Sequence, residues 1–459
     1  MLDHVFYTSH EIQINPGHRP TLYLDCFVFA RNHLRKFSVE CTLAIKSAEI
    51  MSGYRSVHRE NLGTFPIWQV ATSPILSTLC NTNQTMATWR LWLACGDGVV
   101  RGYRVVEKSL DSENNSLDAA ACEVIMTHVL VGRSQKNPRA KQYDRQMCNV
   151  GCSQVQVARN YVGDDDMAGD LIVVSSDLSG KIRIWVLPED MDNDSLGVDV
   201  PSSGTPKSKI DDEDEANAAS PETAREFYIE NATGTCIKIM PPNTSDVGCI
   251  LLAVPFLDGT IALVSTGIPT PKATEDPIEA GVIVERWSKA TSSIALSVAF
   301  HPKKKTFVVG RQDGLVELFG ESCHRLIQHE SPVRSISFSP DGNLLVTSSD
   351  DGMICVWDYS RGVPALVQHA VQAHATWVIG LVSMFDSRRF LSCGADRQLH
   401  VWSFRQMDQA LHSFTSDDVV WAIDALTTKN KLFSAKKQTQ TRLISGSENG
   451  GLHIYMLQS

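Results

Sequence analysis

The stretch from Ser348 to Asp358 reads SSDDGMICVWD and sets a pattern for the second half of the chain. Small residues lead into an acidic pair and a glycine, and apolar residues then alternate up to a tryptophan. CGADRQLHVWS, residues 393–403, repeats this pattern, and GRQDGLVELFG, residues 310–320, repeats it more weakly. An alternating apolar segment precedes each copy. Each copy therefore predicts a strand followed by two further strands that a tight turn joins.

The unit recurs every ~40–50 residues, which is typical of WD repeats and predicts a β-propeller. We therefore expect an all-β fold, a seven-bladed WD-repeat β-propeller. The register of the second and third blades stays open because they match the pattern weakly. The inner strands of the seven blades are expected to begin near Ile67, Gln154, Cys236, Ala295, Val333, Trp377 and Val420.

The last predicted blade has no room for an outermost strand, because only four residues follow Tyr455. We expect a strand from the N-terminal side, within residues 46–60, to complete that blade. Such a strand closes the ring and removes an exposed sheet edge. The propeller is then expected to span residues 46–459. Residues 1–45 match no repeat and are interpreted as an unassigned N-terminal extension, whose place in the native protein stays open.

Three stretches are expected to be insertions between strands: residues 108–146, 189–225 and 267–287. The second contains the acidic run from Asp211 to Glu215 and few apolar residues. Such a composition cannot bury enough apolar surface to fold and predicts a disordered surface loop. Whether this acidic insertion regulates the protein is left open.

The composition is that of a globular protein, with 459 residues of which 43% are hydrophobic and 20% charged. The net charge of −10 argues against a broad nucleic-acid-binding surface, which needs clustered Lys and Arg. The twelve cysteines include no CxxC pair and are interpreted as buried reduced thiols, which favours a cytosolic or nuclear protein. No segment approaches the ~18 apolar residues of a membrane span, so no membrane association is expected.

Two blades carry a His, a Ser or Thr, an Asp and a Trp at the spacing of the hydrogen-bonded chains of WD repeats. A Ser-His-Asp set also suggests a hydrolase, but recurrence in adjacent blades favours a structural role, and no Gly-x-Ser-x-Gly elbow is present. Phosphate-binding glycine motifs and metal-ligand spacings are also missing, so we expect no catalytic residues, no cofactor and no metal. The two structural sets are His329, Thr347, Asp351 and Trp357, and His374, Ser392, Asp396 and Trp402.

The start of each inner strand is expected to lie on one rim of the central channel, the top face. Tryptophan and arginine gathered on such a surface are typical of binding hot spots. The alternative is that some of these side chains pack sideways between blades. The residues at these positions are Trp68, Ser153, Leu296, Arg334, Trp377, Ile379 and Trp421.

Four stretches resemble the WD-repeat subunit of the superkiller (Ski) complex family, which in animals is also a subunit of the RNA polymerase II-associated factor complex. They are residues 331–352, AHATWV at 373–378, DVVW at 418–421 and HIY at 453–455. The resemblance covers approximately residues 290–459, whereas the first three blades match only generic WD repeats.

The resemblance implies a propeller without enzymatic activity that binds a helical-repeat scaffold subunit and, through it, an RNA helicase. That assembly delivers messenger RNA to the exosome for 3′-to-5′ decay. It implies no direct contact with nucleic acid, and residence in the cytoplasm and the nucleus. Alternatives are a generic WD adaptor, such as a polymerase II-associated factor complex subunit, a ubiquitin-ligase substrate receptor or a chromatin reader, and an enzyme. Family members grip partners with a top-face patch, which corresponds by repeat spacing to Trp68, Leu296, Arg334, Trp377, Ile379 and Trp421.

Overall fold

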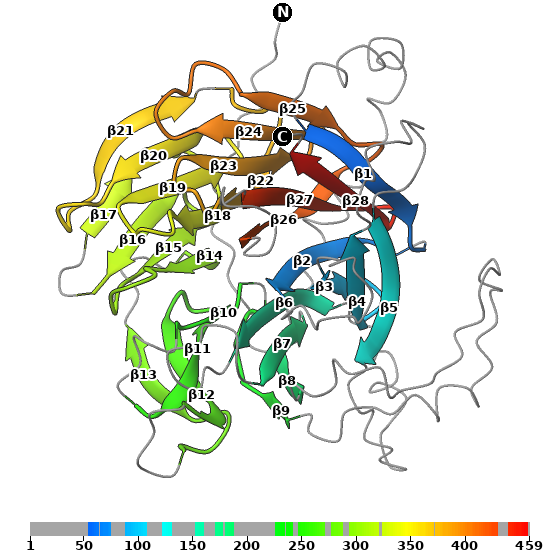
Figure 1. Cartoon of the computed structure of the whole chain (residues 1–459). Helices are drawn as coiled ribbons and strands as arrows, with labels where there is room; N and C mark the ends of the chain where they lie inside the picture. The colour runs from blue at the N-terminus through cyan, green and yellow to red at the C-terminus, as the bar shows by residue number, and fades with distance from the viewer. Residues whose placement is uncertain are drawn as a thin grey trace, which may run out of the picture. The chain divides into compact units, whose positions relative to one another are not determined.

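Seven four-stranded antiparallel sheets make up the described part of the chain (Figure 1). The computed structural model describes residues 54–63, 65–74, 88–107, 122–130, 152–159, 170–177, 180–187, 225–234, 236–241, 247–270, 277–287, 293–320, 324–370, 372–429 and 439–457. All regular elements within these ranges are β-strands, so no helix in them could cross a membrane. The described strands belong to one compact unit, Ser52–Ser459.

Each sheet is one blade, and its strands are given from the inner to the outer edge. The first three blades are β2 (Ile67–Pro74), β3 (Thr88–Cys95), β4 (Val100–Glu107) and β5 (Cys122–Leu130); β6 (Cys152–Arg159), β7 (Leu171–Asp177), β8 (Lys181–Leu187) and β9 (Arg225–Tyr228); and β10 (Lys238–Ile239), β11 (Cys249–Pro255), β12 (Ile261–Pro269) and β13 (Ile283–Trp287).

The remaining four blades follow the same order. They are β14 (Ala295–Phe300), β15 (Phe307–Arg311), β16 (Leu315–Phe319) and β17 (His324–Ile327); β18 (Val333–Phe338), β19 (Leu344–Ser349), β20 (Ile354–Asp358) and β21 (Ala365–Ala370); β22 (Val378–Ser383), β23 (Arg389–Gly394), β24 (Gln398–Ser403) and β25 (His412–Thr415); and β26 (Val420–Lys429), β27 (Thr439–Ser447), β28 (Gly451–Leu457) and β1 (Tyr54–Asn61).

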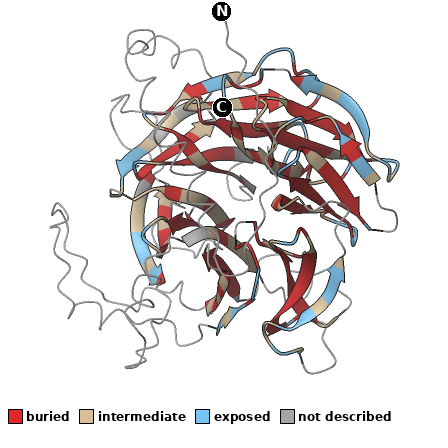
Figure 2. Ribbon diagram, turned by 180° about the vertical axis from the view of Figure 1, so that it is seen from behind, coloured by how far each residue is buried: buried red, intermediate tan, exposed pale blue. Residues whose placement is uncertain are grey.

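The inner strands contact one another in sequence around a closed ring, from β2 through β6, β10, β14, β18, β22 and β26 back to β2. The second strands are the most buried, because a neighbouring blade covers each of their faces. β7 and β11 are buried at every position, whereas β9 and β13 are mostly exposed. Figure 2 shows this gradient as red strands near the channel and pale blue segments at the outside. The expected seven-bladed β-propeller is confirmed.

An N-terminal strand closes the ring, as expected. β1 pairs antiparallel with β28, from Tyr54 opposite Leu457 to Asn61 opposite Gly451. This places the outer strand of the last blade at the start of the described chain and covers the edge that β28 would otherwise leave unpaired.

Two of the expected insertions contain outer strands. β5 lies within residues 108–146, and β13 and the end of β12 lie within residues 267–287, so these ranges are not insertions throughout. β5 reads CEVIMTHVL and is mostly apolar, but it was missed in the sequence because polar stretches flank it on both sides. The acidic run 211–215 and the extension 1–45 lie outside the described residues.

Six cysteines among the described residues are buried and form no disulfide with one another. Burial disfavours the charged thiolate and raises the pKa of Cys95 to about 11 and that of Cys355 to about 12. These thiols therefore pack as small apolar groups.

Candidate functional site

A β-bulge at the start of the inner strand sets the rim position in six of the seven blades. The pairing register shifts once between Ile67 and Gln69, and an equivalent shift follows the first residue of β6, β14, β18, β22 and β26. A bulged residue has no direct cross-strand partner, so its side chain is re-aimed away from the regular ladder. The residues at these bulges are Trp68, Ser153, Leu296, Arg334, Ile379 and Trp421.

Five of the six patch residues line one cavity of about 320 Å³ in the channel: Trp68, Leu296, Arg334, Ile379 and Trp421. The sixth, Trp377, lies just before β22 and does not line the cavity, but its ring centroid is 5.2 Å from the guanidinium carbon of Arg334. All six side chains are partly exposed. We call these six residues the rim patch. The side chain of Ser153 lies outside the described ones.

The two tryptophans at the seam of the ring are in contact. The ring centroids of Trp68 and Trp421 lie 5.2 Å apart, and the ring planes meet at 70°. This edge-to-face geometry places the positive edge of one ring against the negative face of the other. The pair therefore forms a fixed aromatic wall on one side of the cavity.

Arg334 is already held by a carboxylate of its own blade. Its Nε donates to Asp350 Oδ1 at 2.7 Å and its Nη2 donates to Oδ2 at 2.8 Å. Desolvation raises the pKa of Asp350, although the guanidinium opposes this shift. The two-pronged ion pair holds the guanidinium near Trp377. Because Asp350 already neutralises its charge, Arg334 offers a partner mainly the flat surface of its guanidinium group.

Deeper in the cavity lie two charged residues that the sequence analysis did not single out. Asp424 Oδ2 accepts hydrogen bonds from the backbone N and the Oγ1 of Thr72, both at 2.7 Å, and Oδ1 accepts one from Ala425 N at 2.8 Å. Lys238 lines the same cavity from the third blade. The signal available in the sequence was a charged residue between two apolar neighbours of an inner strand, as in Ile237-Lys238-Ile239 and Ile423-Asp424-Ala425.

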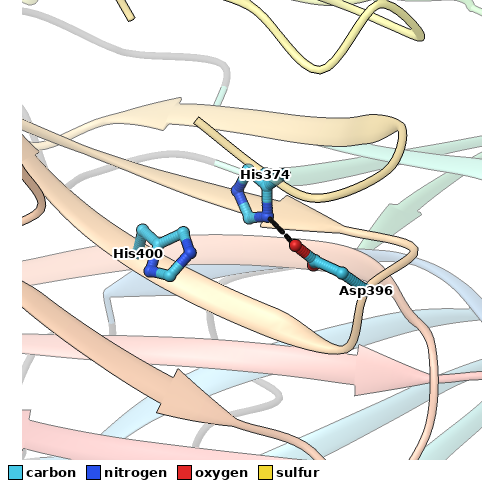
Figure 3. Close-up of side chains that lie close together, drawn as sticks. All are labelled: His374, Asp396 and His400. Carbon is cyan, nitrogen blue, oxygen red and sulfur yellow. Dashed lines mark hydrogen bonds and ion pairs between the residues drawn. The ribbon is translucent and has the colours of Figure 1, made fainter. Parts of the chain in front are cut away.

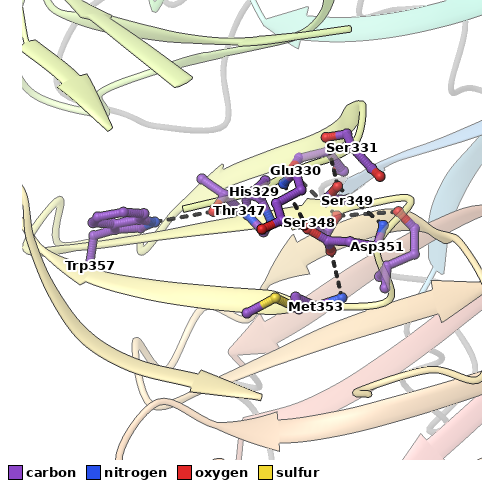
Figure 4. Close-up of polar contacts among 11 residues, drawn as sticks. His329, Glu330, Ser331, Thr347, Ser348, Ser349, Asp351, Met353 and Trp357 are labelled. Carbon is purple, nitrogen blue, oxygen red and sulfur yellow. Dashed lines mark hydrogen bonds and ion pairs between the residues drawn. The ribbon is translucent and has the colours of Figure 1, made fainter. Parts of the chain in front are cut away.

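The two predicted tetrads are hydrogen-bonded chains within their blades. In the fifth blade, His329 Nδ1 lies 3.1 Å from Asp351 and Nε2 lies 2.8 Å from Thr347 Oγ1. Trp357 Nε1 donates to the same hydroxyl at 3.1 Å (Figure 4). The His329 contact contributes to lowering the pKa of Asp351 although desolvation opposes it. The tetrad thus ties β19 and β20, the acidic turn between them and the loop before β18 together.

The sixth blade repeats this arrangement. His374 lies 3.0 Å from Asp396 through Nδ1 and 2.8 Å from Ser392 Oγ through Nε2, and Trp402 Nε1 donates to Ser392 at 2.9 Å. Ser392 is fully buried, and its hydroxyl already contacts both His374 and Trp402. A nucleophile must reach its substrate, so this Ser-His-Asp set serves the scaffold better than it serves hydrolysis.

His374, Asp396 and His400 bring three potential metal-ligand atoms within 4.8 Å of one another (Figure 3). Both ring nitrogens of His374 are bound within the tetrad, and His400 Nδ1 lies 2.8 Å from Ser413 Oγ. A metal ion would have to displace these bonds. Desolvation, together with the neighbouring His374, lowers the pKa of His400 to about 4, so this ring packs as a neutral group.

Comparison with known proteins identifies the repeat. The WD domain, G-beta repeat family (WD40) matches residues 320–358 and 366–403. An uncharacterized WD repeat-containing protein of Schizosaccharomyces pombe is 30% identical over 115 residues, which are 25% of this chain and 21% of that protein. The LEC14B protein of Lithospermum erythrorhizon is 29% identical over 120 residues, 24% of this chain and 25% of that protein.

A WD repeat-containing protein 91 homolog of Dictyostelium discoideum is 26% identical over 126 residues, 26% of this chain and 16% of that protein. The chain therefore spans a quarter or less of the length of these three relatives. Each similarity covers about a quarter of this chain, and a shared repeat determines the fold and not the binding partner. Together with the seven closed sheets, it shows that the chain is a WD-repeat protein with a seven-bladed β-propeller fold.

Proposed function

We propose that this chain is a protein–protein interaction scaffold without catalytic activity, and that the rim patch is its docking surface. The observation that carries the proposal is the bulge series. The same backbone irregularity recurs in six blades, and five of its side chains have large apolar, aromatic or guanidinium surfaces. These surfaces line a single cavity with the two tryptophans in contact.

The patch has the composition that binding surfaces favour. Tryptophan and arginine offer large contact areas and lose little conformational freedom when they are already braced. Trp68 and Trp421 brace each other, and Asp350 braces Arg334. An extended segment of a partner would place an apolar side chain against the aromatic wall and its backbone across the rim.

The finer proposal is that the chain is the WD-repeat subunit of a superkiller-like complex. It would bind a helical-repeat scaffold subunit and, through it, an RNA helicase, and so assist exosomal 3′-to-5′ messenger RNA decay in the cytoplasm, with a second population in the nucleus. This rests on the resemblance at residues 331–352, 373–378, 418–421 and 453–455. The alternative is a generic WD adaptor, such as a polymerase II-associated factor complex subunit, a ubiquitin-ligase substrate receptor or a chromatin reader.

The test is affinity purification of the tagged full chain from its own cells, with partners identified by mass spectrometry. Recovery of a helical-repeat scaffold and an RNA helicase supports the superkiller assignment, whereas recovery of polymerase-associated factors or of a ubiquitin ligase supports an alternative. Trp421→Ala should remove these partners. Ile327→Ala, which changes an exposed apolar residue of β17, should retain them. Equal recovery by both variants would show that the rim patch is not the docking surface.

The absence of catalytic activity has its own test. A broad panel of hydrolase substrates should give no turnover with the purified chain. Turnover that disappears in the Ser392→Ala variant would overturn this part of the proposal.

A further inference from the structure

Lys238 and Asp424 occupy equivalent positions on two inner strands. Lys238 pairs with Ala253 and Asp424 pairs with Ile444, and each of these partners lies six residues before the glycine of its turn. The same relation holds in the other five blades, although the sixth has Arg397 in place of the turn glycine, and the equivalent residues are uncharged. Those residues are Ala71, Gln156, Ala299, Ser337 and Val382.

This level of the channel lies beneath the aromatic wall. Asp424 follows Trp421 by three residues, which corresponds to about 10 Å along a strand. Both charged residues line the same cavity as five of the six rim-patch residues. A group that enters past Trp68 and Trp421 therefore meets one positive and one negative side chain at the same depth.

The carboxylate is satisfied and the ammonium is not. Thr72 and Ala425 donate three hydrogen bonds to Asp424. The Lys238 ammonium makes no hydrogen bond or ion pair within the described residues. The more distant charge of Asp424 acts only to raise its pKa, against the effect of desolvation. Lys238 is partly exposed, but desolvation by the surrounding protein lowers the pKa of its ammonium. A desolvated ammonium without a close partner is costly, so a ligand that pairs with it gains affinity.

We infer that Lys238 is a binding site for a carboxylate of the docked partner segment, an acidic side chain that reaches into the channel beyond an apolar one held at the rim. This inference rests on the proposed function and names the chemistry that the site recognises. A carboxylate suits the site because an ammonium and a carboxylate form a short, charge-assisted hydrogen bond. A phosphate fits less well, because repulsion from Asp424 increases with the charge of the ligand.

The test uses two probes that differ only in charge, phenylhexanoate and phenylhexanamide, titrated into the full chain by calorimetry. The phenyl ring of each probe is designed to contact the tryptophans of the rim patch, and its carboxylate or amide end is designed to reach Lys238 in the channel. The acid should bind about tenfold more tightly than the amide, since a hydrogen bond to a charged group is worth more than a neutral one. Equal affinities, or no binding of the acid, would overturn the inference, and this comparison needs no variant.

Variants assign the effect to Lys238. Lys238→Met, which keeps the length and removes the charge, should bind both probes equally, whereas Lys238→Arg should keep the preference for the acid. Deletion of the acidic run 211–215 should leave the affinity for the acid unchanged. A gain in affinity would show that the chain's own acidic run occupies Lys238 and would overturn the assignment to a partner.

Different experimental results would refute the carboxylate site and the proposed docking surface. Trp421→Ala should weaken both probes by the same factor and leave their ratio unchanged. Loss of the acid preference in the wild-type chain, with partner capture still dependent on Trp421, would refute the carboxylate site alone. Partner capture that does not depend on Trp421 would refute the docking surface.

Discussion

Trp68 and Trp421 belong to the first and last blades and yet lie edge to face with their ring centroids 5.2 Å apart. The seam that closes the propeller is therefore also one wall of the candidate docking site. β2 contacts β26 directly across this seam, and β1 completes the last blade outside it. Closure of the ring and assembly of the site depend on the same junction.

The aromatic pair should act as a unit in binding. Trp68→Ala and Trp421→Ala should each weaken capture of the partner by about 2 kcal/mol. The double variant should lose less than the sum, because each single variant already removes the contact between the rings, with a coupling of about 0.5–1.5 kcal/mol. Calorimetry with the isolated partner segment measures this cycle. Strict additivity would show that the two rings act independently.

Arg334 should not tolerate replacement by lysine. Arg334→Lys keeps the charge but loses the two-pronged bond to Asp350 and the flat surface beside Trp377, so both stability and partner binding should fall by about 1 kcal/mol. The matched control is Arg389→Lys, which changes a surface arginine paired with Asp386 outside the cavity. If the two variants behave alike, the bracing of Arg334 has no role in the site.

The tetrad hydroxyls should be important for stability. Thr347→Val keeps the shape of the side chain but leaves the buried indole N–H of Trp357 without its acceptor, which should cost about 1–3 kcal/mol. Thr347→Ser retains the hydroxyl and should cost less. Urea unfolding followed by tryptophan fluorescence compares the two midpoints. A serine variant as unstable as the valine variant would assign the loss to packing.

His400 should make the protein less stable in mild acid. Its pKa is lowered from 6.5 to about 4 in the folded chain, so between these values the unfolded chain takes up a proton that the folded chain does not. Stability is therefore fully present above about pH 6.5 and falls as the pH decreases to about 4, by up to roughly 3 kcal/mol. Asp396 has a lowered pKa and adds a further loss below about pH 4.

Urea midpoints measured from neutral pH down to about pH 4 test this dependence. His400→Gln should flatten the decrease, because glutamine cannot take up a proton. The wild-type chain serves as the reference at each pH. An unchanged slope in the variant would assign the acid sensitivity to other groups.

Removal of β1 should open the ring. A chain that begins at Leu62 lacks the partner of β28 and exposes the backbone groups of that edge. We expect a melting temperature lower by several degrees and increased self-association, measured by scanning fluorimetry and size-exclusion chromatography. A chain that begins at Tyr54 keeps β1 and is the control. Equal melting temperatures of the two chains would mean that β1 contributes little to closure.

The sequence by itself determined the repeat, the all-β class and the two tetrads. The reason is that their interactions are local: the His, Ser or Thr, Asp and Trp of a tetrad lie within one blade, and turn residues such as Asp351 and Gly352 form the hairpin beside them. The expected closure by an N-terminal strand followed from the edge that the last blade would otherwise expose.

Only the tertiary structure decided which side chains meet across blades. Thr72 and Asp424 are 352 residues apart in the sequence, and no local pattern predicts their hydrogen bonds. The placement of Lys238 in the channel likewise depends on how the blades surround it. Within the fifth blade, the partnership of Arg334 with Asp350 depends on the bulge at the start of β18. β5 and β13 were missed because polar stretches adjoin each of these short segments in the sequence. The alternation of apolar residues along a strand predicts which side chains a blade buries. Contacts between blades depend instead on how the ring closes.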